Sequence, residues 1–96
     1  MDKEWYIVII KGLDFIQTCG ACPEQYDVKD SEGNQIGYVR LRFGGLYCQY
    51  PNVGGETIYS ADIGDGWTGC FKNDKQRKFH LNRIADKLLE QLECLD

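Results

Sequence analysis

The chain has 96 residues, of which 43% are hydrophobic, and a net charge of −4 at pH 7. This length is typical of one domain, residues 1–96, which can bury enough surface to fold without disulfides or metals. The acidic balance argues against direct nucleic-acid binding, and no apolar run reaches the roughly 18 residues that a membrane span needs.

The N-terminal half predicts antiparallel strands. Residues 5–11 are rich in β-branched and aromatic side chains and apolar on both faces, which predicts a central strand. Residues 12–24 carry glycines, cysteines and a proline, and predict an irregular connection. Residues 25–30 and 35–43 predict a hairpin, because they flank a turn that contains glycine and asparagine.

Alternation assigns the side chains of residues 35–43 to two faces of the sheet. One face carries Val39, Leu41 and Phe43, and the other carries Tyr38, Arg40 and Arg42. Residues 46–50 and 56–62 predict two further strands, the last with Ile58 on one face and Tyr59 on the other. The predicted sheet therefore spans about residues 5–62.

A glycine-rich loop over residues 63–72 leads to a predicted helix over about residues 74–95, which Asn73 or Asp74 can cap. Its apolar residues recur at helical spacing. They are Phe79, Ile84, Ala85, Leu88, Leu89, Leu92 and Leu95. The sequence thus predicts an α+β fold: an antiparallel meander of four to five strands with one long C-terminal helix on one face. The helix should cover Val39, Leu41, Phe43 and Ile58.

The five cysteines raise the question of a metal site. Cys19 and Cys22 have a spacing that lets two thiolates bind one ion, but a structural zinc site needs four ligands. A small zinc-stabilised domain would use Cys19, Cys22, Cys48 and Cys70. A redox pair fits poorly, because Pro23 and a strand follow the motif instead of a helix. We favour reduced thiols and no cofactor.

Two other features are candidates for chemistry. His80 is the only histidine, and it falls in the first half of the helix without the local signature of a catalytic triad or a metalloprotease. A small enzyme that uses a cysteine or His80 is therefore an alternative, but we expect no enzyme. The loop 64–69 lacks the lysine of a P-loop, so Trp67 either supports a tight turn or anchors a partner.

The strongest binding candidate is the face that carries Tyr38, Arg40 and Arg42, which Tyr47, Gln49 or Tyr59 could flank. Tyrosine and arginine dominate binding hot spots, although these arginines could instead pair with Asp27 or Glu56. The segment between Arg42 and Lys72 contains no base and carries the acids Glu56, Asp62 and Asp65.

Three stretches of the sequence resemble small uncharacterised acidic proteins carried by phages and mobile elements of Gram-positive bacteria. They are Gly12-Leu13-Asp14-Phe15, the run from Cys19 to Val28, and Ile36-Gly37-Tyr38-Val39-Arg40-Leu41-Arg42. The resemblance covers most of the chain and implies a setting: proteins of this kind are often binders or inhibitors of host machinery, anti-CRISPR proteins among them. It assigns no activity to particular residues.

These observations lead to one functional hypothesis. The chain is a non-enzymatic protein-binding module, an inhibitor of a host defence or nucleic-acid-handling protein that acts by occlusion. Its contact residues would be Tyr38, Arg40, Arg42, Glu56, Asp62, Asp65 and Trp67. The partner would be a basic protein rather than nucleic acid or a membrane, and homodimerisation is left open. Residues 1–4 lack the basic start of a signal peptide, so we expect a cytoplasmic location.

Overall fold

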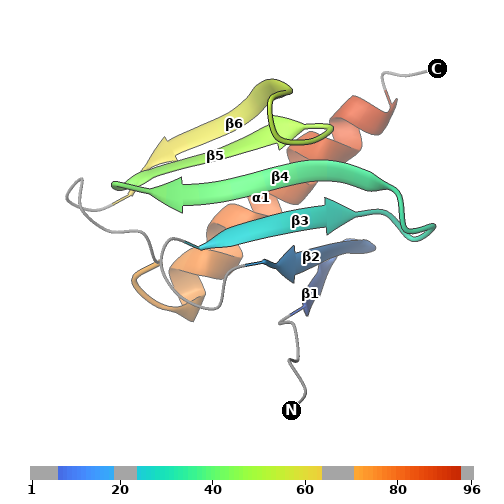
Figure 1. Cartoon of the computed structure of the whole chain (residues 1–96). Helices are drawn as coiled ribbons and strands as arrows, with labels where there is room; N and C mark the ends of the chain where they lie inside the picture. The colour runs from blue at the N-terminus through green and yellow to red at the C-terminus, as the bar shows by residue number, and fades with distance from the viewer. Residues whose placement is uncertain (1–6, 19–23, 64–70, 94–96) are drawn as a thin grey trace, which may run out of the picture.

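The computed structural model describes residues 7–18, 24–63 and 71–93. Within these residues the fold is α+β, with a six-stranded antiparallel sheet in sequential order and one helix against one face (Figure 1). The elements are β1 (Ile7–Ile10), β2 (Leu13–Gln17), β3 (Gln25–Lys29), β4 (Gln35–Arg42), β5 (Gly45–Tyr50), β6 (Glu56–Asp62) and α1 (Asp74–Glu93). The predicted meander and C-terminal helix are thus confirmed, with one strand more than expected.

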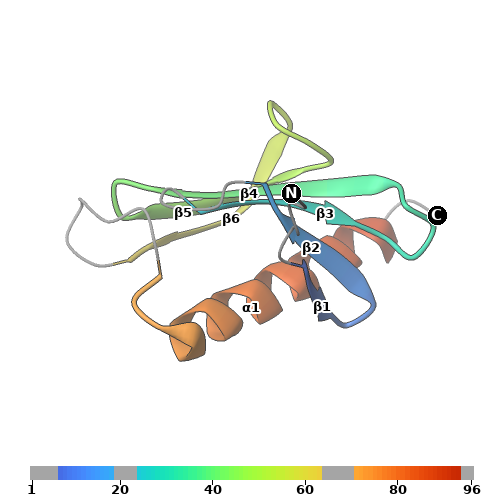
Figure 2. The same ribbon diagram turned by 60° about the horizontal axis from the view of Figure 1, so that its bottom comes forward.

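The additional strand is β2, which lies where residues 12–24 were expected to be irregular. Its alternation is regular: Leu13 and Phe15 are buried in the core, and Phe15 lies opposite Val28 of β3. The prediction of a central first strand was also wrong. β1 lies at the edge of the sheet, where Ile9 remains 70% exposed. Figure 2 shows that β1 and β2 bend toward α1, so they close one side of the core.

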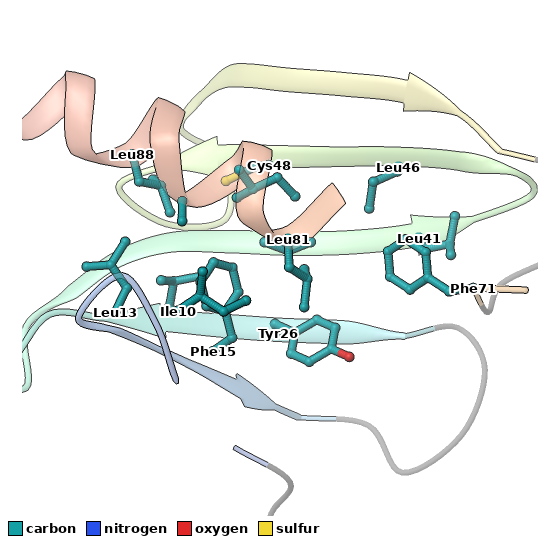
Figure 3. Close-up of a cluster of buried hydrophobic side chains, with 14 of the residues drawn as sticks. Ile10, Leu13, Phe15, Tyr26, Leu41, Leu46, Cys48, Phe71, Leu81 and Leu88 are labelled. Atoms are coloured by element: carbon teal, nitrogen blue, oxygen red, sulfur yellow. The ribbon is translucent and has the colours of Figure 1, made fainter. Parts of the chain in front are cut away.

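The core lies between α1 and the sheet (Figure 3). The helix buries Leu81, Ile84, Ala85 and Leu88, which recur at steps of three and four and form one apolar stripe. Leu89 and Leu92 pack at its margin, whereas Leu95 lies outside the described residues. Phe79 was assigned to this stripe wrongly, because its side chain is 56% exposed.

The helix begins with a side-chain cap. The Gln76 N–H donates to Asn73 Oδ1 over 2.9 Å, and Gln76 Oε1 accepts a hydrogen bond from the Lys72 N–H over 2.7 Å. The first contact satisfies a backbone donor that the first turn leaves without a helical partner, and the second ties the residue before the cap to the helix. Asn73, rather than Asp74, is therefore the capping residue.

Two corrections concern which face a side chain takes. Phe43 does not continue the alternation of β4, because the strand ends at Arg42 and Phe43 adopts a left-handed turn conformation with φ 52°. It is 63% exposed instead of buried under α1.

In β6 a bulge adds one residue, since Cys48 pairs with Tyr59 and Gln49 with Thr57. Ile58 and Tyr59 therefore both pack against the core, and Tyr59 does not flank Arg40.

A buried carboxylate joins the start of β3 to the start of the helix. Glu24 is 3% exposed and accepts hydrogen bonds from Tyr26 Oη (2.8 Å), the Phe71 N–H (3.0 Å) and Arg77 Nε and Nη2 (3.1 and 3.0 Å). Burial raises the pKa of Glu24, but the donors from Arg77, Phe71 and Tyr26 together outweigh it and lower the pKa below its usual value. We call these four residues the Glu24 cluster.

Candidate binding surface

The face of the sheet opposite α1 is hereafter the open face, and Figure 1 views it directly, with the helix behind. Side chains that pair across antiparallel strands share a face, so the register defines this surface. Three rows cross it. They are Arg42, Gly45 and Asp62; Gln25, Arg40, Tyr47 and Ser60; and Asp27, Tyr38, Gln49 and Thr57. The predicted trio of Tyr38, Arg40 and Arg42 thus shares one face, together with Tyr47.

The two tyrosines are held in place by neighbours on the same face. Tyr38 Oη donates to Gln25 Oε1 over 3.0 Å, and the rings of Tyr38 and Tyr47 lie 6.4 Å apart at a tilt of 47°. Burial, with a contribution from Tyr47, raises the pKa of Tyr38. Tyr38 therefore stays protonated at neutral pH and keeps its hydroxyl proton for donation. We call Tyr38, Arg40, Arg42 and Tyr47 the Tyr/Arg surface.

The arginines of this surface do not pair with the acids that the sequence offered them. No ion pair among the described residues involves Arg40 or Arg42. Asp27 instead accepts a hydrogen bond from Gln35 Nε2 over 3.0 Å. The Nε atom of Arg40 is buried without a hydrogen-bond partner in the described part of the chain, and the Arg42 guanidinium lies 4.8 Å from the centroid of the Phe43 ring.

The predicted acidic contacts separate in the structure. Asp62 lies on the open face beside Gly45. Glu56 lies at the other end of β6, opposite Tyr50, which packs against the core, so it faces the helix side of the sheet. Asp65 and Trp67 lie outside the described residues. Of the predicted contact residues, the structure therefore brings together Tyr38, Arg40, Arg42 and Asp62, and it leaves Glu56 apart.

The cysteines can be assessed at one position. Cys48 is fully buried between the sheet and α1, as Figure 3 shows, while Cys19, Cys22 and Cys70 lie outside the described residues. The described residues contain no group of three or more potential metal ligands. The zinc set of Cys19, Cys22, Cys48 and Cys70 therefore stays a prediction.

Cys48 is expected to be chemically inert in the folded protein. Burial raises the pKa of its thiol to about 12, so almost no thiolate, the reactive form, exists at neutral pH. Treatment of native protein with a thiol reagent, followed by peptide mass mapping, should leave Cys48 unlabelled, whereas labelling in denaturant should modify it fully. Equal labelling of Cys48 in both conditions would contradict the buried position.

His80 lies at the boundary of the core. Its Nδ1 is 2.9 Å from Tyr59 Oη, and its ring stacks on Phe71 with 6.0 Å between centroids. Burial and the nearby Arg83 lower the pKa of His80, which favours the neutral ring. This packing explains the position without a catalytic role, and an enzyme that uses His80 or a cysteine stays an untested alternative.

The described residues include no helix long and apolar enough to cross a membrane. Sequence reasoning missed two features of importance, the Glu24 cluster and the proximity of Asp62 to Gly45, because both depend on strand register or long-range contacts. The chain matches no protein-family model, and no curated protein and no solved structure is significantly similar to it.

Proposed function

We propose that this protein is a non-enzymatic binding module that docks a protein partner on the Tyr/Arg surface. The observation that carries the proposal is that Arg40 and Arg42 lie on the open face by strand register and form no ion pair within the described residues. Arginines whose role was to stabilise the sheet would be expected to pair with cross-strand acids. Here no acid of the described residues pairs with the two guanidinium groups, which favours acceptors on another molecule as their partners.

The geometry also favours affinity. Tyrosine and arginine supply large contact areas with directional hydrogen bonds, and both are enriched among residues that dominate binding energy. Tyr38 is already fixed by its bond to Gln25 and by the Tyr47 ring. Because a partner would not have to immobilise the Tyr38 side chain, the entropic cost of binding is reduced.

The partner of this proposal is a protein, and the mode of action is occlusion. The open face presents both charge signs, with Arg40 and Arg42 on the inner strand β4 and Asp62 on the edge strand β6. Such a surface fits a partner that offers acceptors to the arginines and a cation to Asp62. The resemblance to mobile-element proteins supports an inhibitor of a host defence or nucleic-acid-handling protein as this partner.

Affinity purification from the native host tests the proposal with two matched variants. Arg40→Ala removes a guanidinium from the Tyr/Arg surface, and Arg83→Ala removes one from the exposed side of α1. We expect wild type and Arg83→Ala to recover the same partner at low salt, and Arg40→Ala to recover at least about tenfold less, as for a hot-spot residue. Recovery of no partner at low salt, or equal recovery with both variants, would contradict the proposal.

A further inference from the structure

A hollow of about 470 Å³ lies on the open face, between the ends of β5 and β6 and next to the Tyr/Arg surface. Six residues line it. They are Gly45, Leu46, Tyr47, Ser60, Ala61 and Asp62. By register, four of these belong to the open face (Gly45, Tyr47, Ser60 and Asp62), whereas Leu46 and Ala61 pair with each other on the core side. The hollow is therefore continuous with the surface that we propose for binding.

The hollow exists because the middle of one row has no side chain. In the row of Arg42, Gly45 and Asp62, the glycine separates the two charged residues. Neighbouring strands lie about 4.8 Å apart, so the backbones of Arg42 and Asp62, which are two strands apart, are separated by about 10 Å. No ion pair joins them in the described part of the chain. The space above Gly45 thus stays open to another molecule.

Three of the groups that line this space can contact a cation. Asp62 is exposed and supplies a carboxylate, Ser60 supplies a hydroxyl, and Tyr47 supplies an aromatic ring. The charged group of Arg42 stacks on Phe43, in the turn beyond the strand. A guanidinium matches the remaining set, because it binds a carboxylate in bidentate fashion and stacks on an aromatic face.

We propose that this hollow receives an arginine side chain of the protein partner. The guanidinium would pair with the Asp62 carboxylate, hydrogen-bond Ser60 and stack on Tyr47. This inference rests on the proposed function and specifies one contact within it. It also gives a physical basis for a basic partner, because the chain contains no lysine or arginine between Arg42 and Lys72. The cations next to the hollow are Arg42, whose charged group lies over Phe43, and Arg40, which is paired with Tyr47 in the neighbouring row.

Gly45 offers a variant that fills the hollow while keeping the fold. Gly45 is not among the residues with positive φ, and a Cβ built on it meets only the Arg42 carbonyl oxygen, at an ordinary 3.5 Å. Valine is favoured in strands, so Gly45→Val should fold as well as the wild type. Asp62→Asn is the second variant, since it removes the charge and keeps the shape. Glu56→Gln is the control, because it makes the same charge change on the same strand but on the other side of the sheet.

The test is a titration of isotope-labelled protein with N-acetyl-arginine amide, followed by amide NMR signals. We expect saturable shifts at the amides of residues 45, 47, 60 and 62, with N-acetyl-glutamate amide giving none at residues 60 and 62, which lie on the side of the hollow away from Arg40 and Arg42. Asp62→Asn and Gly45→Val should each weaken these shifts at least about tenfold, as expected for loss of a charge-assisted contact, and Glu56→Gln should retain them. Absence of shifts at these amides, or unchanged binding in both hollow variants, would overturn the inference.

The proposed function and this inference can fail separately. If a captured partner is lost with Arg40→Ala but retained with Gly45→Val and Asp62→Asn, the Tyr/Arg surface binds and the hollow does not. If arginine amide binds the hollow but no partner depends on Arg40, the hollow recognises a cation and the proposed docking surface is wrong.

Discussion

Replacement of Glu24 by glutamine is expected to lower the free energy of unfolding by about 3–5 kcal/mol, the usual cost of removing one member of a buried ion pair. The change would remove the buried anion of the Arg77 guanidinium, which is only 21% exposed, and leave it paired with the exposed Asp74 alone. It would also weaken the acceptor for the Phe71 N–H. Domains of this size are stable by about 5–15 kcal/mol, so the loss should be evident in urea unfolding.

Asp74→Asn is the matched control for this prediction, because Asp74 pairs with the same arginine but is 78% exposed. Exposed ion pairs contribute about 0–1 kcal/mol, and an acid in the first helical turn adds about 0.3–1 kcal/mol through the helix dipole. The control should therefore lose clearly less stability than Glu24→Gln. Equal losses in the two variants would show that burial of Glu24 does not determine its contribution.

The Glu24 cluster also predicts a dependence of stability on pH. The pKa of Glu24 is lower in the folded state than the ordinary value of 4.5, so ionised Glu24 stabilises the fold at higher pH. This contribution is lost as the pH falls through the folded-state pKa and the carboxylate takes up a proton. Wild-type stability should therefore fall more steeply with acid than that of Glu24→Gln, and parallel curves would contradict the assignment.

Local patterns predicted those elements whose residues follow a regular period. The hairpin of β3 and β4, the strands β5 and β6, and the helix all have clear periodicity or turn signals, and all are present. β2 was missed although Leu13 and Phe15 alternate, because the glycine, cysteine and proline residues around it indicated a loop. The sequential order of the meander was predicted, but the edge position of β1 was not, because its residues are apolar on both faces as in a central strand.

The shared face of the predicted Tyr/Arg residues could be predicted from a regular period, but the face of each predicted acid could not. Alternation along β4 is uninterrupted between Tyr38 and Arg42, so the shared face of these residues could be read from one strand. The acids of β6 could not be assigned in this way, since the bulge at Ile58 changes the side on which Glu56 lies relative to Asp62. The Glu24 cluster joins residues 53 positions apart, for which no sequence period exists.

The helix provides the final prediction, in which two apolar residues two positions apart have opposite roles. Successive residues turn by about 100° around a helix, so Leu81 and Phe79 lie about 200° apart and cannot share a stripe. Leu81 is fully buried with Ile84 and Leu88, three and seven positions further on, while Phe79 is exposed. Leu81→Ala should therefore cost about 2–5 kcal/mol, through reduced burial and a residual cavity.

Phe79→Ala should change the free energy of unfolding by less than about 1 kcal/mol, because the higher helix propensity of alanine offsets the weak interactions of the exposed ring. The ring meets the His80 ring edge to face, with 5.0 Å between centroids, and the Arg83 guanidinium lies 5.5 Å from the Phe79 centroid. Chemical unfolding of both variants measures the difference. A large loss of stability for Phe79→Ala together with a small one for Leu81→Ala would mean that the helix packs on the sheet through its other side. The open face would still exist in that case, but the register of α1 on the sheet would have to be revised.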